Sequence, residues 1–508
     1  MLGDLAGCAA SRDPGPSLLF WCVAWRWDSS GSEAEVTILR EIGCLPCPIA
    51  GAGVPPKYGD YEAQRHWMEI TINLPLSQWY TNSTQNDLAY WGLDYPPLSA
   101  YQSWVHGKVL QRWVPEAVAL GSSRGIETPR SKLALRQTVL ASDLAVYFPA
   151  AAFLALTLHG ARLSRQAITT LAQLLLGPGL ILIDHGHFQF NCINLGLTLA
   201  AVACTLRGSL LAGAALFCAA LNHKQMILYF APAFFSHMLG TCLQQRSAWG
   251  KLFLLASIGG VVLASFGIVW VPFLATPGGP LPVLRRIFPT ARGLFEDYVA
   301  NLWCASSLAI KWRRLLAPSQ LLRLCAAGTL AAVLPAMACQ LRRPTRRAFL
   351  LGLANSSLAF FLLAYQVHEK SVLLPLAALG TLGGPAAELA QYVGVYSMLP
   401  LLRKDGLATA AAAVAVAYAA VLGTLRPALP PAWRAARAVF LAGAAAITVG
   451  FWAVPPPPRY PFLEDAACMA WCCTALVCLF GYTNVLQVQE CWGPGAARRG
   501  RHGKRKGA

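Results

Sequence analysis

Two short polar segments near the start of this 508-residue chain carry the residue types that most readily do chemistry. Residues 59–67 read GDYEAQRHW, and residues 91–97 read WGLDYPP. Each segment places an aspartate, Asp60 or Asp94, beside aromatic rings, and catalytic residues concentrate on loops held by a rigid scaffold. Carboxylates next to aromatic rings suit a site that binds a sugar, so these segments are the first candidates for a functional site.

The two aspartates differ in their local sequence. Asp60 follows Gly59, which allows a ligand to approach the backbone closely. Asp94 precedes two prolines, which stiffen the chain after it. We expect Asp60 to act as a general base and Asp94 to position a substrate. The sequence leaves open which of them is the base, because an aspartate that only fixes a turn would also explain Asp94.

Further polar groups lie at the ends of apolar stretches, where the cost of placing them in a membrane favours a functional role. These groups are His187, Gln189, Lys224, His368, Glu369 and Lys370. Cations at such positions would bind a lipid phosphate and stabilise the charge on a leaving phosphate. A positively charged loop or an internal Glu–Lys pair would account for some of them without any substrate.

A second polar stretch, residues 282–311, includes Arg292, Glu296 and Asp297. An arginine-rich loop is usually cytosolic, but the acidic and aromatic neighbours here favour a role in the site. We expect no metal site. His185 and His187 point to different sides of a helix, and no third ligand follows at a suitable spacing.

The composition excludes an ordinary soluble domain. The chain is 56% hydrophobic and 13% charged, against about 25% charged residues in soluble domains. Apolar runs recur from about residue 133 to 488, so we predict an all-α polytopic membrane protein with about 10–13 transmembrane helices. The net charge of +18 lies largely in short clusters such as Arg403 and Lys404, which are typical of cytoplasmic loops. No nucleic-acid recognition motif accompanies it.

These patterns divide the chain into four parts. Residues 1–54 form an atypical segment without a clear first membrane span, and residues 55–132 form a luminal catalytic loop. The sequon at Asn82 favours the luminal assignment. Residues 133–490 form the multi-span domain, with the second polar loop near 282–311. Residues 491–508 form a basic cytosolic tail, whose Lys504 and Lys506 have the spacing of a dilysine retrieval signal.

Motifs spread over roughly residues 55–402 resemble the dolichyl-phosphate-glucose-dependent alpha-1,3-glucosyltransferases of lipid-linked oligosaccharide synthesis. They occupy residues 55–60, 62–67, 73–75, 78–80, 91–97, 123–125, 179–184, 187–189, 224–226, 284–289, 292–297 and 367–371. Within that family, segments 62–67, 91–94 and 224–226 are similar to the first of two glucosyltransferases. There are two departures. The family normally has a membrane span before the first loop, and it tends to have an aromatic residue where His185 stands.

The resemblance implies a GT-C-type membrane fold in the endoplasmic reticulum, with a luminal active site and a cytosolic C-terminus. It implies inverting transfer of glucose from dolichyl-phosphate-glucose to Man9GlcNAc2-PP-dolichol, as a step in building the N-glycosylation precursor, without a metal or another cofactor. We expect the substrates to be bound by Glu62, Arg65, His66, Trp67, Trp91, Tyr95, His187, Gln189, Lys224, Arg292, Glu296, Asp297, His368, Glu369 and Lys370.

Two other classes of function stay open on the sequence alone. A non-catalytic relative would bind a glycolipid without turning it over, and a donor-plus-acceptor assay separates it from an enzyme. A multi-span transporter would also carry ionisable groups between spans. Transporters, however, tend to have internal repeats, and we find no repeat here; flux across sealed vesicles would test this reading.

Overall fold

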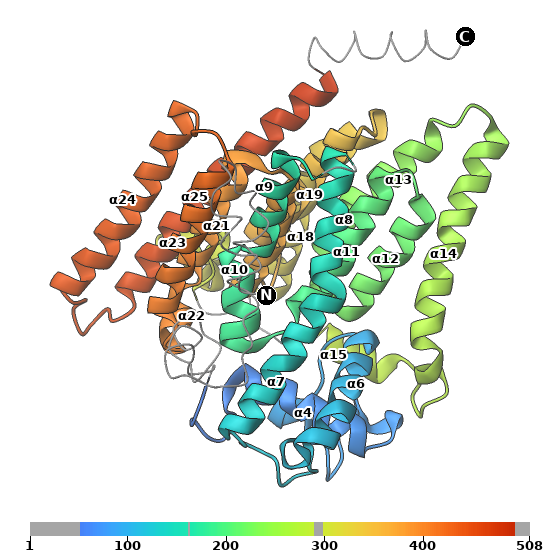
Figure 1. Ribbon diagram of the computed structural model, residues 1–508, viewed down its shortest axis with the longest axis vertical. Coiled ribbons are helices and arrows are strands. Elements are labelled where there is room, and N and C mark those ends of the chain that lie inside the picture. Colours follow the sequence, from blue (N-terminus) through green and yellow to red (C-terminus); the bar gives the residue numbers. More distant parts are fainter. Residues whose placement is uncertain (1–50, 161–162, 289–297, 493–508) are drawn as a thin grey trace, which may run out of the picture.

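The computed structural model describes residues 51–160, 163–288 and 298–492, and every structural statement below concerns these residues. Their regular elements are all helices (Figure 1). The predicted all-α fold class is therefore confirmed. A bundle of long helices makes up most of the molecule, and a group of shorter helices covers one end of it.

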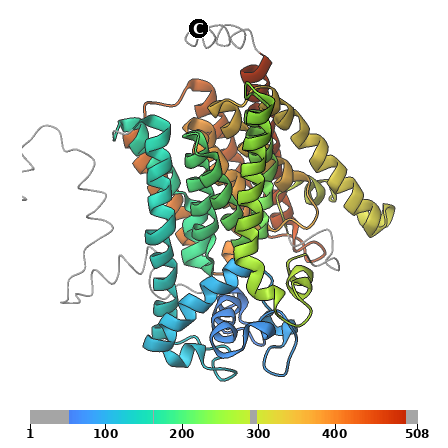
Figure 2. The same ribbon diagram turned by 90° about the vertical axis from the view of Figure 1, so that its right-hand side faces the viewer.

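The shorter helices form a cap, defined as residues 51–128 (blue in Figures 1 and 2). Its elements are α4 (Gly59–Asn73), η2 (Leu76–Gln78), α5 (Leu88–Trp91), α6 (Pro97–Trp113) and η3 (Pro115–Val118). The two longer helices, α4 and α6, pack closely. A side chain at Gly107 of α6 would meet the carbonyl oxygen of Met68 at 2.8 Å, so only glycine permits this approach.

Helix α4 begins where the backbone turns sharply and is buried over most of its length. Tyr58 before it has a left-handed φ of 54°. Asp60 and Glu62 occupy the first turn, where negative charge is favoured by the helix dipole. Every residue from 61 to 71 is buried. The helix is therefore the centre of the cap, and Asp60 in its first turn contacts residues of the bundle.

The bundle contains nine helices, among the described residues, that are long and apolar enough to cross a membrane. They are Pro129–His159, Arg165–Phe188, Gln225–Leu243, Ala248–Leu274, Pro318–Arg342, Arg346–Leu363, Ala408–Leu425, Pro431–Ala453 and Leu463–Trp492. Asn191–Leu206 and Leu210–His223 are shorter apolar helices packed among them. The chain is a multi-span membrane protein.

In element terms, the first half of the bundle runs from α7 to α15. The elements are α7 (Pro129–Ser142), η4 (Asp143–Tyr147), α8 (Phe148–His159), α9 (Arg165–Leu175), α10 (Pro178–Ile181), η5 (Leu182–Phe188), α11 (Asn191–Leu206), α12 (Leu210–His223), η6 (Gln225–Phe230), α13 (Ala231–Leu243), α14 (Ala248–Leu274) and α15 (Leu281–Ile287). Helix α14 stands at the edge of the bundle (Figure 1) with many exposed apolar side chains, as expected of a lipid-facing helix.

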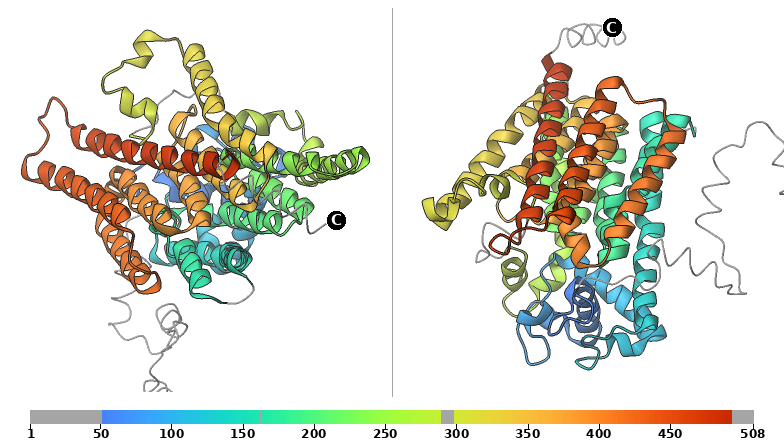
Figure 3. Two further views of the ribbon diagram at one scale, coloured as in Figure 1. Left: turned by 90° about the horizontal axis from the view of Figure 1, so that it is seen from above. Right: turned by 90° about the vertical axis from the view of Figure 1, so that its left-hand side faces the viewer.

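The second half runs from α16 to α25. Its elements are α16 (Leu302–Ser306), α17 (Trp312–Leu315), α18 (Pro318–Arg342), α19 (Arg346–Leu363), η7 (Glu369–Val372), α20 (Leu373–Leu382), α21 (Gly384–Ser397), α22 (Leu399–Lys404), α23 (Ala408–Leu425), α24 (Pro431–Ala453) and α25 (Leu463–Trp492). Helix α18 leans away from the bundle (Figure 2). The last turns of α25 lie at the end opposite the cap (Figure 3, right).

The span that begins with α9 ends in an irregular way beneath the cap. After α10 the chain forms a π-helical turn, η5, and π-helical turns are frequent at functional sites. The turn ends at Phe188, whose φ of 84° is rare for a residue with a side chain. The Phe188 ring packs on Tyr61 of α4, with centroids 5.1 Å apart. This contact fixes the residues around it against the cap.

Part of the second polar stretch also joins the cap. Val283 and Ile287 of α15 belong to the apolar core of the cap, together with Trp67 and Tyr80. Arg286 donates hydrogen bonds to the carbonyl oxygens of residues 92 and 93, at 2.6 and 3.1 Å. The described part of the second polar loop, which the sequence separates from the first loop, therefore packs against the first loop.

Candidate active site

The carboxylate of Asp60 is the meeting point of the cap and the bundle. Its Oδ2 atom lies 2.7 Å from Lys370 Nζ and 3.0 Å from His187 Nε2. The same oxygen accepts a hydrogen bond from Gln189 Nε2 at 2.7 Å. The Asp60 side chain keeps 25% of its surface exposed, so this side chain is only partly buried.

Different elements bring these groups together. Asp60 comes from the first turn of α4, and Lys370 from η7, the short helix after α19. His187 and Gln189 come from the end of η5 and the extended residue that follows it. The residues are far apart in the chain, and the sequence predicted all four of them as site residues. The sequence did not show that three of them contact the same oxygen of Asp60; the fold brings them together.

The surroundings keep Asp60 ionised. Burial alone would raise the pKa of this carboxyl group, but the charge of Lys370 and the contacts with His187 outweigh it. The pKa of Asp60 therefore lies well below its ordinary value. Burial would lower the pKa of Lys370, but the charges of Asp60 and Glu369 raise it. At neutral pH the two groups form an ion pair.

A second cation, Lys224, lies behind Gln189. Its Nζ donates to Gln189 Oε1 at 2.9 Å and to Asn191 Oδ1 at 2.6 Å. It also sits 4.7 Å from the centre of the Tyr95 ring. Asn191 Nδ2 donates in turn to Asp184 Oδ1 at 2.7 Å. Gln189 thus links the two lysines: its amide nitrogen contacts Asp60 and its amide oxygen contacts Lys224.

Lys224 is almost completely buried, with 3% of its surface exposed. Burial lowers its pKa to about 8, and the nearby charge of Lys370 acts in the same direction. The negative charges of Asp184, Asp60 and Asp94 oppose this lowering. The ammonium group is therefore less strongly protonated than that of an ordinary lysine.

Asp94 lies in the segment between α5 and α6, half-buried at the same end of the bundle. Its carbonyl oxygen accepts a hydrogen bond from Gln225 Nε2 at 3.2 Å, which ties this segment to the residue after Lys224. Its negative charge acts on Lys224. These contacts bring both predicted aspartates to the same region, with Asp60 at the Lys370 side and Asp94 at the Lys224 side.

A second charge cluster on α4 is centred on Arg65. Its guanidinium pairs with Glu62, with N–O distances of 2.6 and 2.7 Å, and with Glu69 Oε2 at 2.7 Å. Ser123 Oγ and the carbonyl of Ala117 accept its remaining hydrogen bonds. Arg65, Glu62 and Glu69 are completely buried. This cluster holds the cap together from the inside.

The other predicted site residues on α4 and α5 also contact the cap. His66 Nδ1 lies 3.3 Å from Glu69 Oε2. Trp67 Nε1 donates to the carbonyl of Trp91 at 2.9 Å, and Trp91 Nε1 donates to the carbonyl of Lys57 at 2.5 Å. The Trp67 and Tyr95 rings meet edge to face at 5.1 Å. Tyr95 and Trp91 are the two of these aromatic groups that are partly exposed.

The remaining predicted residues are placed only in part. His368 and Glu369 are half-buried immediately before Lys370. Arg292, Glu296 and Asp297 lie outside the described residues, as do the segment 1–50 and the tail 493–508. Their predicted roles stay predictions.

Sequence reasoning missed Asp405, a buried residue between α22 and α23. Its Oδ2 atom lies 2.6 Å from His187 Nδ1. This contact places residues 403–405 at the cap end, so the interpretation of Arg403 and Lys404 as a marker of the opposite face is wrong. An aspartate directly after two basic residues and before Gly406 was the available signal, and the basic pair obscured it.

Two further features do not belong to the site. His185 Nε2 pairs with Asp143 Oδ2, at the start of η4, at a distance of 2.7 Å. Within the described ranges, no group of three His, Cys, Asp or Glu residues is arranged to hold a metal ion.

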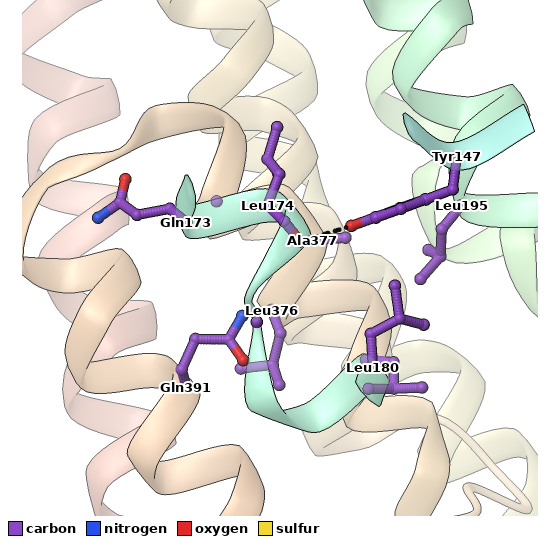
Figure 4. A pocket seen from close by; sticks show the side chains of 11 residues that line it. Tyr147, Gln173, Leu174, Leu180, Leu195, Leu376, Ala377 and Gln391 are labelled. Carbon is purple, nitrogen blue, oxygen red and sulfur yellow. Dashed lines mark hydrogen bonds between the residues drawn. The ribbon is translucent and has the colours of Figure 1, made fainter. Parts of the chain in front are cut away.

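Figure 4 shows a cavity of about 20 Å³, lined by Tyr147, Gln173, Leu376 and Gln391 among others. Tyr147 donates to the carbonyl of Leu174 beside it, at 3.0 Å. Such a space is near the size of one water molecule and cannot hold a sugar. The cavity beside Tyr147 is therefore not a substrate site.

The fold and the site together define a multi-span membrane protein that holds an ionised carboxylate and two lysines between a helical cap and the bundle. The family model of the ALG6, ALG8 glycosyltransferase family matches residues 40–483, and the chain belongs to this family. The predicted membership of a glycosyltransferase family is thus confirmed.

Relatives with assigned names agree with this family. The probable dolichyl pyrophosphate Man9GlcNAc2 alpha-1,3-glucosyltransferase of Arabidopsis thaliana is 43% identical over 462 residues, covering 87% of this chain and 86% of the relative. The dolichyl pyrophosphate Man9GlcNAc2 alpha-1,3-glucosyltransferase of Gallus gallus is 44% identical over 372 residues, 73% of each chain. That of Mus musculus is 44% identical over 383 residues, 75% of each chain.

Proposed function

We propose that the chain transfers glucose from dolichyl-phosphate-glucose to Man9GlcNAc2-PP-dolichol in the endoplasmic reticulum membrane, forming an alpha-1,3 linkage with inversion at the transferred carbon. The names of the relatives support the acceptor and the linkage. The observation that carries the proposal is the Asp60 carboxylate, which is held on one oxygen by three bundle groups and stays partly exposed.

Asp60 is the proposed general base. Its Oδ2 atom is engaged by Lys370, His187 and Gln189, which fixes the carboxylate and leaves Oδ1 to accept the proton of the acceptor hydroxyl. As that proton moves to Asp60, the hydroxyl oxygen bonds to C1 of glucose. The bond between C1 and the phosphate oxygen breaks, and the phosphate leaves with the bonding electrons. An inverting glycosidase uses the same base chemistry, but here the leaving phosphate needs no acid.

The two lysines are the proposed phosphate-binding groups. Lys370 is 2.7 Å from Asp60 and 16% exposed, so it can reach an anion that enters beside the carboxylate. A phosphodiester that draws Lys370 towards itself gains a charge-assisted hydrogen bond and at the same time weakens the ion pair with Asp60. Loss of that pairing raises the basicity of Asp60. Donor binding would therefore prepare the base for the proton transfer.

The other predicted residues divide by their position. Tyr95, Trp91 and Asp94 line the segment next to Lys224 and are proposed to contact sugar. His368 and Glu369 are proposed to act beside Lys370. Glu62, Arg65, His66 and Trp67 face the interior of the cap, so their support for substrate binding is proposed to act through the position of α4.

The cap is proposed to lie in the lumen, with the C-terminal end in the cytosol. The cap and the end of α25 lie at opposite ends of the bundle (Figure 3), which supports this arrangement. The sequon residue Asn82 is on the surface of the cap, between η2 and α5. The proposed domains follow the same division: residues 55–132 form the luminal loop, and 133–490 form the membrane domain.

The decisive test is transfer by the full chain purified in detergent. Dolichyl-phosphate-glucose and a lipid-linked Man9GlcNAc2 acceptor are supplied, with dolichyl-phosphate-mannose as the mismatched donor. We expect glucose transfer by the wild-type chain, and loss of that transfer in Asp60→Asn. A folded wild-type chain that binds the glycolipids without transfer would indicate a binding protein. Glycolipid flux across sealed vesicles without any transfer would indicate a transporter.

A further inference from the structure

We infer that Asp405 is a positioning residue that holds the His187 ring doubly protonated against Asp60, and so sets the pH range in which the base works. The inference rests on the proposed role of Asp60. It concerns a residue that never touches the substrate, because Asp405 reaches Asp60 only through the imidazole ring between them.

The geometry is a buried chain of three groups. Asp405 Oδ2 is 2.6 Å from His187 Nδ1, and Asp60 Oδ2 is 3.0 Å from His187 Nε2. Asp405 and His187 have 4% and 3% of their side-chain surfaces exposed. Asp60 is the open end of the chain, with 25% exposed. A carboxylate thus faces each ring nitrogen, and the inner one is shielded from water.

This placement favours protonation of both ring nitrogens. A neutral imidazole has one N–H and one bare nitrogen; with its proton on Nδ1, the bare Nε2 would face Asp60 Oδ2 at 3.0 Å as well as Lys370 Nζ at 3.2 Å. A doubly protonated ring donates to both carboxylates. Lys370 of η7 also faces the ring, with its Nζ 3.2 Å from His187 Nε2. Further charges act on the two neighbours of the ring: Lys224 acts on Asp60, and Glu369 acts on Lys370. Lys370 is the like charge that opposes protonation, and Asp405 is the added negative charge that compensates for it.

Asp405 also anchors the ring mechanically. It lies at the junction of α22 and α23, and Leu407 two residues later packs against Gly186, where a side chain would meet it at 2.8 Å. The His187 ring is therefore held by its own backbone and by the carboxylate on its far nitrogen. A residue that orients a histidine through its second nitrogen also fixes which proton faces the reacting partner.

The same turn supplies a matched control. Asp143 pairs with His185 at 2.7 Å, so Asp143→Asn and Asp405→Asn each remove the charge from one aspartate–histidine pair of one π-helical turn. Only His187 reaches Asp60. A general weakening of this turn would appear in both variants, whereas loss of the positioning effect would appear only in Asp405→Asn.

The test compares wild type, Asp405→Asn, Asp405→Glu and Asp143→Asn as full chains in detergent. We expect Asp405→Asn to lower kcat roughly 10-fold or more, the size of effect known for outer hydrogen-bond partners of metal-ligating histidines, with little change in donor KM. We also expect the acidic limb of its kcat profile to move up by about one pH unit, since a neutral ring no longer stabilises ionised Asp60. Asp405→Glu should restore the acidic side of the pH profile to its wild-type position. Asp143→Asn should leave both kcat and the pH profile unchanged.

The inference would be overturned if the acidic side of the kcat profile did not move in Asp405→Asn, or if Asp143→Asn lost as much kcat as Asp405→Asn. If Asp405→Asn does not fold, ¹⁵N-histidine NMR of the wild-type chain decides, with His187→Gln to assign the signal. Two protonated ring nitrogens at pH 7 would support the inference, and a neutral ring would overturn it. Because this signal needs no turnover, it separates failure of the inference from failure of the proposed transfer.

Discussion

Helix α4 carries two charge clusters that differ in one respect: the Arg65 cluster is closed and the Asp60 cluster is open. Every polar contact of Arg65 ends on another cap atom, and none of its surface is exposed. Asp60 receives three partners on one oxygen and keeps a quarter of its surface exposed. Both clusters have the residue types of an active site, but only the open one keeps part of its carboxylate side chain exposed.

The difference also separates what each cluster contributes to the protein. Burying charges is costly, and the cost is offset only when pairing and hydrogen bonds are complete. The Arg65 cluster meets this condition and so supports the fold. The Asp60 cluster leaves part of a carboxylate for a ligand. Replacing residues in the two clusters should therefore damage different properties.

The largest effect is expected in the open cluster. Asp60→Asn removes the base but keeps the size of the side chain, and we expect transfer to fall by about 10³-fold, within the usual range for a general base. The thermal unfolding temperature should stay close to that of wild type, since the side chain is partly exposed. Initial rates and unfolding curves of the same preparation measure both. Transfer that survives in the folded variant would move the base to Asp94.

The closed cluster should show the reverse. Arg65→Met leaves the buried carboxylates of Glu62 and Glu69 without their cation, which typically costs about 3–5 kcal/mol of stability. We expect lower yield, a lower unfolding temperature and faster proteolysis of the cap. Donor KM of the fraction that stays folded should be near wild type. A stable Arg65→Met protein with a specific loss of donor binding would mean that this cluster binds substrate.

Within the open cluster, Lys370 should affect the donor more than the fold. Lys370→Gln removes a charged hydrogen-bond donor, an interaction usually worth about 1.5–3 kcal/mol, so kcat/KM for the donor should fall by about 10–100-fold. Lys370→Arg should recover part of it by keeping the charge. Unchanged donor kinetics in both variants would return Lys370 to a purely structural ion pair with Asp60.

Because Lys224 is buried, we expect rising pH to lower the transfer activity and to raise the stability of the fold. Because burial lowers its pKa to about 8 from 10.5, Lys224 loses its charge, and the phosphate loses a partner, as pH rises through 8. Transfer should therefore decline there. Stability should instead rise between about pH 8 and 10.5, because the unfolded chain binds more protons in that window. The transfer rate and the free energy of unfolding, each measured as a function of pH, test the two expectations.

Lys224→Arg provides the control for this pH effect. Arginine stays charged throughout the window, so the alkaline decline in transfer should disappear in that variant. A decline that persists in Lys224→Arg would assign the limb to another group.

The sequence predicted much of this site because the relevant residues stand out locally. His187, Gln189, Lys224 and Lys370 are polar groups at the ends of apolar runs, where polar groups are costly, and Asp60 lies in a polar, aromatic-rich segment before the first membrane span. Composition and the recurrence of apolar runs likewise predicted the helical membrane fold. These signals are local, and a single sequence is sufficient to read them.

The division between the two clusters could not be predicted in the same way. Arg65 and Asp60 lie on one short segment with equally polar neighbours, and which side chain faces the interior depends on how α4 packs against α6 and residues 117–123. Asp405 was missed because its role depends on a contact with His187, 218 positions away in the chain. A local pattern can mark such a residue, but it does not show which distant side chain the residue will contact.

The smallest effect is expected at Asn82, yet it decides which side of the membrane both clusters face. Asn82 lies on the exposed surface of the cap, where its Oδ1 accepts a hydrogen bond from the backbone N–H of Leu88 at 3.1 Å. Asn82→Gln should abolish a glycosidase-sensitive mobility shift in cells, and transfer should stay at the wild-type level because the site is elsewhere. A chain without that shift, and with the cap accessible to a cytosolic protease, would place Asp60 on the cytosolic face and contradict the proposed luminal reaction.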